Sequence, residues 1–101
     1  MRKIEQQMIA AVHTKQNFIK DNTAVFFLSA QETGNPYGSR SAIYLHNNLI
    51  AEYWHDTKQL HVIERTLREY PTNTTKSRLR ALGANVYTKN KITYLDDKPI
   101  N

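Results

Sequence analysis

The clearest local signal lies in residues 42–54, which read Ala42-Ile43-Tyr44-Leu45-His46-Asn47-Asn48-Leu49-Ile50-Ala51-Glu52-Tyr53-Trp54. Two apolar runs of strand length flank the pair Asn47-Asn48. Asparagine tolerates the positive φ angles that a type I′ turn requires at both central positions. The stretch therefore predicts a β-hairpin, with Ile43 and Leu45 on one face and Tyr44 and His46 on the other.

Further strands are predicted on both sides of this hairpin. Thr23–Ser29 is short and rich in β-branched and aromatic residues, which favours a strand over a helix. Its apolar side chains alternate to both faces, which is typical of a central strand or of a contact between subunits. Residues 85–95 predict a second hairpin around Lys89-Asn90-Lys91, and residues 96–101 are expected to form a flexible tail.

The segment 58–67 fits two structures. Its apolar residues match a helical stripe, and they also match a strand that follows the hairpin. We favour the strand, because Val62 and Thr66 are β-branched and a short turn at residues 55–57 would continue an antiparallel meander.

Two helices complete the expected elements. Residues 3–19 carry apolar side chains at helical spacing, and residues 75–82 form a short helix with Gly83 just past its end. Gln31–Ser41 contains Gly34-Asn35-Pro36 and predicts a long loop. The predicted fold class is α+β: an N-terminal helix, an antiparallel sheet of three to four strands, a short helix and a C-terminal hairpin.

Length and composition limit the classes of protein. With 101 residues the chain has room for one domain, residues 1–101. It has no apolar run long enough for a membrane span and no apolar segment typical of a signal peptide, so we expect an intracellular, soluble protein. Without cysteine it has no disulfide, no cysteine-ligated zinc and no thiol chemistry.

Motifs for catalysis and cofactors are missing. The four histidines have no metal-ligand spacing, and with only three glycines the chain has no phosphate-binding loop. No serine lies in a nucleophile-elbow context. We therefore expect no metal, no cofactor and no enzymatic activity.

The positive charge is concentrated in one segment. The formal net charge is +5, and residues 70–95 contain five basic and no acidic residues, whereas the rest of the chain balances to zero. A solvated basic surface and a patch that meets a polyanion are both consistent with this segment. Its helix start is rich in hydroxyl groups, which suits either capping or phosphate binding.

Tyrosines lie beside these basic residues. Aromatic residues make up 10% of the chain, and strand tyrosines next to lysines are a pattern used to stack unpaired bases, although they also serve packing. The candidate nucleic-acid-binding residues are Lys76, Arg78, Arg80, Lys89, Lys91, Tyr87, Tyr94, Thr74 and Thr75.

Three stretches together resemble small early proteins of tailed bacteriophages: Ile4-Glu5-Gln6-Gln7-Met8, Tyr44-Leu45-His46-Asn47-Asn48-Leu49-Ile50-Ala51 and Thr74-Thr75-Lys76-Ser77-Arg78-Leu79-Arg80-Ala81-Leu82. By size, charge and phage context, rather than by a residue match, the chain is similar to Drc-type transcription regulators. The resemblance implies single-stranded DNA binding in the host cytoplasm.

The expected function is therefore non-enzymatic binding of nucleic acid, with single-stranded DNA favoured, by a homo-oligomer. One alternative is a host-directed factor that binds a bacterial protein such as RNA polymerase or a defence component. Another is a small-molecule-binding protein or small enzyme.

Overall fold

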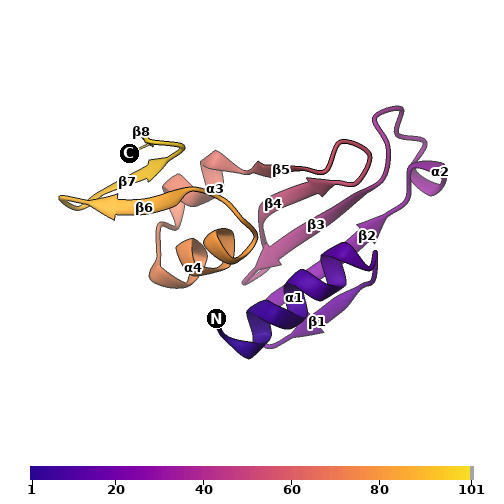
Figure 1. Cartoon of the computed structure of the whole chain (residues 1–101), viewed down its shortest axis with the longest axis horizontal. Coiled ribbons are helices and arrows are strands. Elements are labelled where there is room, and N and C mark those ends of the chain that lie inside the picture. Colours follow the sequence, from indigo (N-terminus) through magenta and orange to yellow (C-terminus); the bar gives the residue numbers. More distant parts are fainter. Residues whose placement is uncertain (101) are drawn as a thin grey trace.

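The computed structural model describes residues 1–100 and has an α+β fold with two antiparallel sheets (Figure 1). In chain order the elements are α1 (Lys3–His13), β1 (Phe18–Lys20), β2 (Thr23–Leu28), α2 (Ala30–Thr33), β3 (Arg40–Leu45), β4 (Asn48–Trp54), β5 (Gln59–Val62), α3 (Glu64–Glu69), α4 (Asn73–Ala81), β6 (Val86–Lys89), β7 (Ile92–Leu95) and β8 (Lys98–Pro99). The α+β class is confirmed, and the large sheet has five strands where three to four were predicted. None of the helices in this part of the chain combines the length and apolar character that a membrane span needs.

The large sheet is a meander in the order β1-β2-β3-β4-β5. The predicted hairpin is its β3–β4 unit, and Leu45 pairs with Asn48. The turn lies at His46-Asn47, with φ +49° and +65°, one residue earlier than predicted. A two-residue type I′ turn matches the twist of the strands it joins, so the strand register fixes its position.

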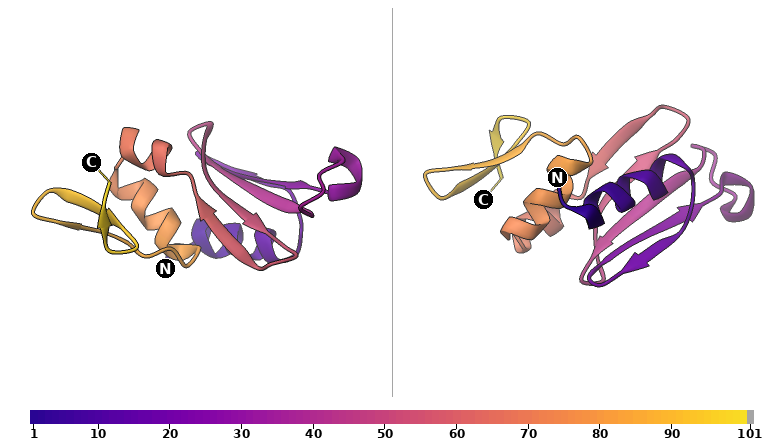
Figure 2. Two further views of the ribbon diagram at one scale, coloured as in Figure 1. Left: turned by 90° about the horizontal axis from the view of Figure 1, so that it is seen from above. Right: turned by 60° about the horizontal axis from the view of Figure 1, so that its bottom comes forward.

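Helix α1 covers one face of this sheet (Figure 2, right). Met8, Ala11 and Val12 are buried in a core that also contains Val25 of β2 and Ile43 of β3. The helix ends at His13, where residues up to 19 were predicted to be helical, and Lys15 has φ +58°. The chain then returns as β1, the first strand of the sheet.

Several other boundaries differ from the prediction. Residues 58–67 divide into the predicted strand, β5, and the first part of α3, whose Leu67 is buried in the core. The predicted loop begins inside the short helix α2, which Ser29 caps by accepting a hydrogen bond from the amide of Gln31. The short helix predicted at 75–82 is α4, which begins at Asn73 after a cap from Thr72.

The second sheet, in the order β6-β7-β8, contains the predicted C-terminal hairpin. The expected flexible tail is instead folded as far as Ile100, because Asp96-Asp97 form a further turn with positive φ and β8 pairs with β7. Ile100 is buried, and its carbonyl accepts a hydrogen bond from Arg68 Nε at 2.7 Å. Residue 101 lies outside the described residues.

A buried ion pair joins α1 to α4. Arg78 Nη1 lies 2.9 Å from Glu5 Oε2, and both side chains are only 4% exposed. Arg78 Nε also donates to Thr23 Oγ1 of β2, and Ser77 Oγ donates to Glu5 Oε2. Burial alone would raise the pKa of Glu5, but the hydrogen bonds from Ser77 and Arg78 outweigh it and hold the pKa below its ordinary value.

We predict that Arg78→Ala destabilises the fold by about 3–5 kcal/mol, because it leaves the carboxylate of Glu5 buried without its cation. Urea denaturation would measure the decrease. Arg65→Ala, which removes an arginine with 83% of its side chain exposed, should change stability by about 0.5 kcal/mol or less. An Arg78 variant as stable as the Arg65 variant would contradict this role.

A second polar cluster lies between the large sheet and the end of α1. His55 Nε2 is 2.8 Å from Oγ of the buried Ser41, and its ring packs edge-on against Phe27 and Tyr53. Burial lowers the pKa of His55, and the positive charges of Lys15 and His13 lower it further. The folded chain therefore holds His55 neutral more strongly than the unfolded chain does.

We predict that stability falls as the pH is lowered from neutral through the ordinary histidine range near 6.5. The unfolded chain takes up its His55 proton first, and the decrease continues until the lowered pKa of the folded state is passed. Urea denaturation across this range should show a smaller decrease for His55→Gln than for wild type, whereas His46→Asn, at an exposed turn position, should behave like wild type. An equal decrease in all three would contradict the role of His55.

Candidate nucleic-acid interface

Three of the predicted site residues are not on the surface. Arg78 is held in the ion pair with Glu5, and Lys76, which is 8% exposed, donates from Nζ to Thr88 Oγ1 of β6. The hydroxyl of Thr75 is 2.9 Å from that of Thr72 and the residue is buried. Arg78 and Lys76 hold α4 against α1 and β6, and Thr75 belongs to the cap of α4, so all three are buried where an exposed surface was expected.

The other predicted residues are accessible. Arg80 is exposed, and its Nη1 donates to the carbonyl of Val86, which ties the end of α4 to β6. Thr74 is half-buried in the first turn of α4. Lys89 and Lys91 are exposed. Lys89 ends β6, and Lys91 lies in the two-residue hairpin turn, in which Asn90 and Lys91 have φ +52° and +66°. Three cations of the acid-free segment therefore reach solvent.

The tyrosines form a stacked pair on the hairpin. Tyr87 pairs with Tyr94 across β6 and β7, and their rings lie 5.0 Å apart between centroids with 9° between planes. Because β6 is an edge strand among the described strands, the ring of Tyr87 has no cross-strand neighbour on its outer side. One aromatic face is thus left for a further ring to stack on.

The alternation of side chains separates the two faces of this hairpin. Val86 and Thr93 are buried on the side that meets α4, where Lys76 reaches Thr88. The opposite side carries Tyr87 and Lys89 of β6 and Ile92 and Tyr94 of β7. Together with Lys91 in the turn, we call these five residues the hairpin surface (Figure 1, yellow and orange strands).

Charge along the hairpin surface runs from positive to negative. The lysines lie at the β6–β7 turn, and Asp96 and Asp97 lie in the turn at the opposite end of β7. The phenol of Tyr87 donates to Asp97 Oδ1 at 3.0 Å, and this hydrogen bond raises the pKa of Tyr87 above its ordinary value. The ring therefore stays neutral at physiological pH, and a polyanion is drawn toward the lysine end.

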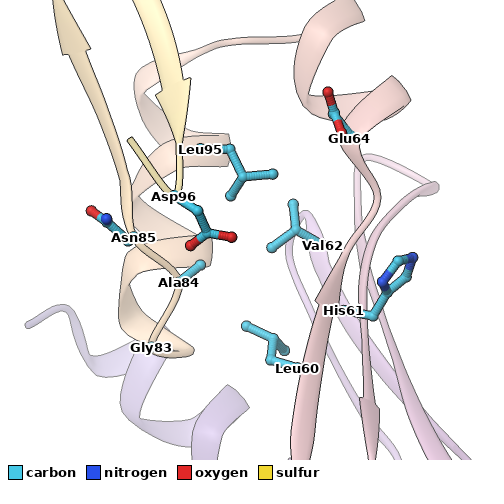
Figure 3. Close-up of a pocket in the computed structure, with 9 residues that line it drawn as sticks. All are labelled: Leu60, His61, Val62, Glu64, Gly83, Ala84, Asn85, Leu95 and Asp96. Carbon is cyan, nitrogen blue, oxygen red and sulfur yellow. The ribbon is translucent and has the colours of Figure 1, made fainter. Parts of the chain in front are cut away.

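A cavity of about 380 Å³ lies between β5 and the base of the hairpin (Figure 3). Leu60 and Val62 point into it from one side, Leu95 and the carboxylate of Asp96 point into it from the other, and Glu64 lies farther up, at the start of α3. No lysine or arginine lines it. Its charge repels phosphate, so this cavity does not extend the hairpin surface as a path for a DNA backbone.

The residues described here bring no three metal-ligating side chains together in one place. A further group of aromatic side chains lies on the face of the large sheet opposite α1, among them Phe26 and Tyr44, whose rings meet edge-on at 5.7 Å. The alternation of apolar residues in 23–29 predicted two apolar faces of that strand, but the strand register that places Phe26 beside Tyr44 is not visible in the sequence.

Comparison with protein families identifies a match over the whole chain. A family model described as Kyanoviridae Gp96 protein covers residues 1–101. Neither a curated protein nor a solved structure matches the chain.

Proposed function

Because the chain belongs to the family of Kyanoviridae Gp96 proteins, and is therefore a bacteriophage protein, we propose that it is a non-enzymatic protein that binds single-stranded DNA through the hairpin surface. The observation that carries the proposal is the placement of a stacked tyrosine pair and two exposed lysines together on β6–β7 and its turn. Because the chain resembles small early phage proteins, we assign this activity to a regulatory step in the host cytoplasm.

The geometry supports single strands over duplex. Single-strand binding combines cations that follow the backbone with aromatic rings on which unpaired bases stack. Lys89 and Lys91 supply the cations, with Arg80 nearby in sequence on the same α4–β6 unit, and Tyr87 supplies a free ring face. In duplex DNA the bases are already stacked within the helix, so the tyrosines gain nothing there and only the electrostatic part of the binding remains.

Fluorescence anisotropy with labelled single-stranded and duplex DNA at two salt concentrations tests the proposal. Salt-sensitive binding that is tighter for single strands supports it. Absence of binding at low salt would make the hairpin a solvated basic surface, and binding of a host protein would then become the favoured function.

We predict that Lys89→Gln combined with Lys91→Asn weakens single-strand binding and flattens its salt dependence. The slope of log K against log salt should fall by about 0.7 for each phosphate that a lysine no longer neutralises, and so by about 1.4 for two. Asparagine is used at position 91 because it tolerates the positive φ of that residue.

Lys3→Ala with Arg65→Ala is the matched control for this pair. It removes the same charge from two exposed positions outside the hairpin and should leave the salt slope close to that of wild type. Equal slopes for the hairpin pair and the control pair would contradict a hairpin site.

We also predict that Tyr87→Ala weakens single-strand binding by about 1–3 kcal/mol, the contribution of one stacked base. Tyr87→Phe keeps the ring and removes only the hydrogen bond to Asp97, so its affinity should stay near that of wild type. Anisotropy titrations would measure both, with thermal melting as the check that the hairpin is intact. If the two variants weaken binding equally, the ring does not stack on a base.

A further inference from the structure

We propose that the face of the large sheet opposite α1 binds a second copy of this chain in a two-fold symmetric dimer. The open face, as we call it, is defined by the apolar side chains Ile19, Phe26, Leu28, Tyr44, Leu49 and Trp54 of β1–β4. It lies on a different sheet from the hairpin surface, so the inference does not depend on DNA binding.

The strand register places these side chains together. Cross-strand partners point to the same side of a sheet. Ile19 pairs with Ala24, Ala24 with Tyr44 and Tyr44 with Leu49, which makes one row across four strands. A second row begins at Phe26, and a third runs from Leu28 through Arg40 to Trp54.

The open face exposes apolar surface that a single chain does not cover. Ile19 is 71% exposed and Phe26 is 36% exposed. The ring of Tyr44 stands edge-on to that of Phe26 and extends the aromatic area across the neighbouring strand. Single exposed apolar residues are ordinary, but a contiguous apolar and aromatic area on a monomer indicates an interaction surface.

The charges of the open face fit a second copy. Its rows contain one arginine and one carboxylate: Arg40 Nε lies 2.9 Å from Glu52 Oε2, and the guanidinium stands 5.3 Å from the centre of the Trp54 ring. His61 of β5 pairs with Glu52, and together with the phenol of Tyr44 it completes the titratable side chains of these rows. A face with no net charge offers a polyanion no electrostatic attraction.

A two-fold axis makes this arrangement self-complementary. In a two-fold interface, when residue i of one copy contacts residue j of the other, residue j of the first copy also contacts residue i of the second. Arg40 of each copy can therefore meet Glu52 of the other copy. Two sheets that pack face to face lie about 10 Å apart, with the side chains of both filling the space between them. The tall aromatic rings of the open face suit that role, and a small domain gains buried surface from it.

Sedimentation equilibrium tests the proposal without any ligand. Wild type should give twice the 11.8 kDa mass of the chain, and Phe26→Glu should give the monomer mass. Tyr37→Glu is the matched control, because it replaces another exposed aromatic ring, 78% exposed and outside the open face, and it should stay dimeric. Circular dichroism confirms that each variant is folded.

A charge exchange separates contacts between copies from contacts within one copy. Arg40→Glu alone and Glu52→Arg alone each give a face with two like charges, so each should be monomeric, while an equimolar mixture should form a dimer of one copy of each. If Arg40 and Glu52 interact only within one chain, mixing the two variants would not restore the dimer.

Three outcomes would overturn the proposal: a monomeric wild type, a Phe26→Glu variant that stays dimeric, or single variants that mixing does not restore. If wild type is monomeric and Phe26→Glu also abolishes single-strand binding, the open face is a nucleic-acid surface instead.

Discussion

The buried contact between Glu5 and Arg78 is the constraint on which the arrangement of the two sheets depends. It fixes α4 against α1 and, through Thr23, against the large sheet. The same helix then carries the second sheet, because Lys76 reaches Thr88 and Arg80 reaches the carbonyl of Val86. A buried ion pair gains little net stability over an apolar pair, but it fails when either partner is removed, so it defines one position of the helix.

This constraint explains why the charge pattern of the sequence overstated the basic surface. Residues 70–95 contain no carboxylate, so every cation in them looked free of a local partner. The partner of Arg78 is Glu5, 73 positions away, and a contact at that separation leaves no periodic signal. Residues 76 and 80 are four apart and share a helix face that differs from that of Arg78, yet this spacing does not tell which face meets the core. The exposed cations that remain on the hairpin, Lys89 and Lys91, lie at a turn, where burial is rare.

The fold was predictable wherever local chemistry determines it. Asn47 and Asn90 tolerate positive φ, so both hairpins were found, one of them displaced by a residue. The missed elements depend on distant contacts. β8 forms because its pairing with β7 and the burial of Ile100 stabilise the turn at Asp96-Asp97. In the sequence alone, the same polar residues are typical of a flexible tail. Helix α3 contributes Leu67 to the core. Residues 58–67 contain both β5 and the first part of α3, so their apolar pattern matched a strand and a helical stripe at once.

The two proposed surfaces differ in chemistry in a way that assigns them different partners. The hairpin surface combines lysines with one free aromatic face, which suits a polyanion with unpaired bases. The open face is neutral and aromatic, which suits another neutral aromatic face. If both proposals hold, each dimer presents two hairpin surfaces. A DNA strand long enough to reach both hairpin surfaces binds the second surface at a high effective concentration. The length of the DNA strand, more than its base sequence, then sets the affinity.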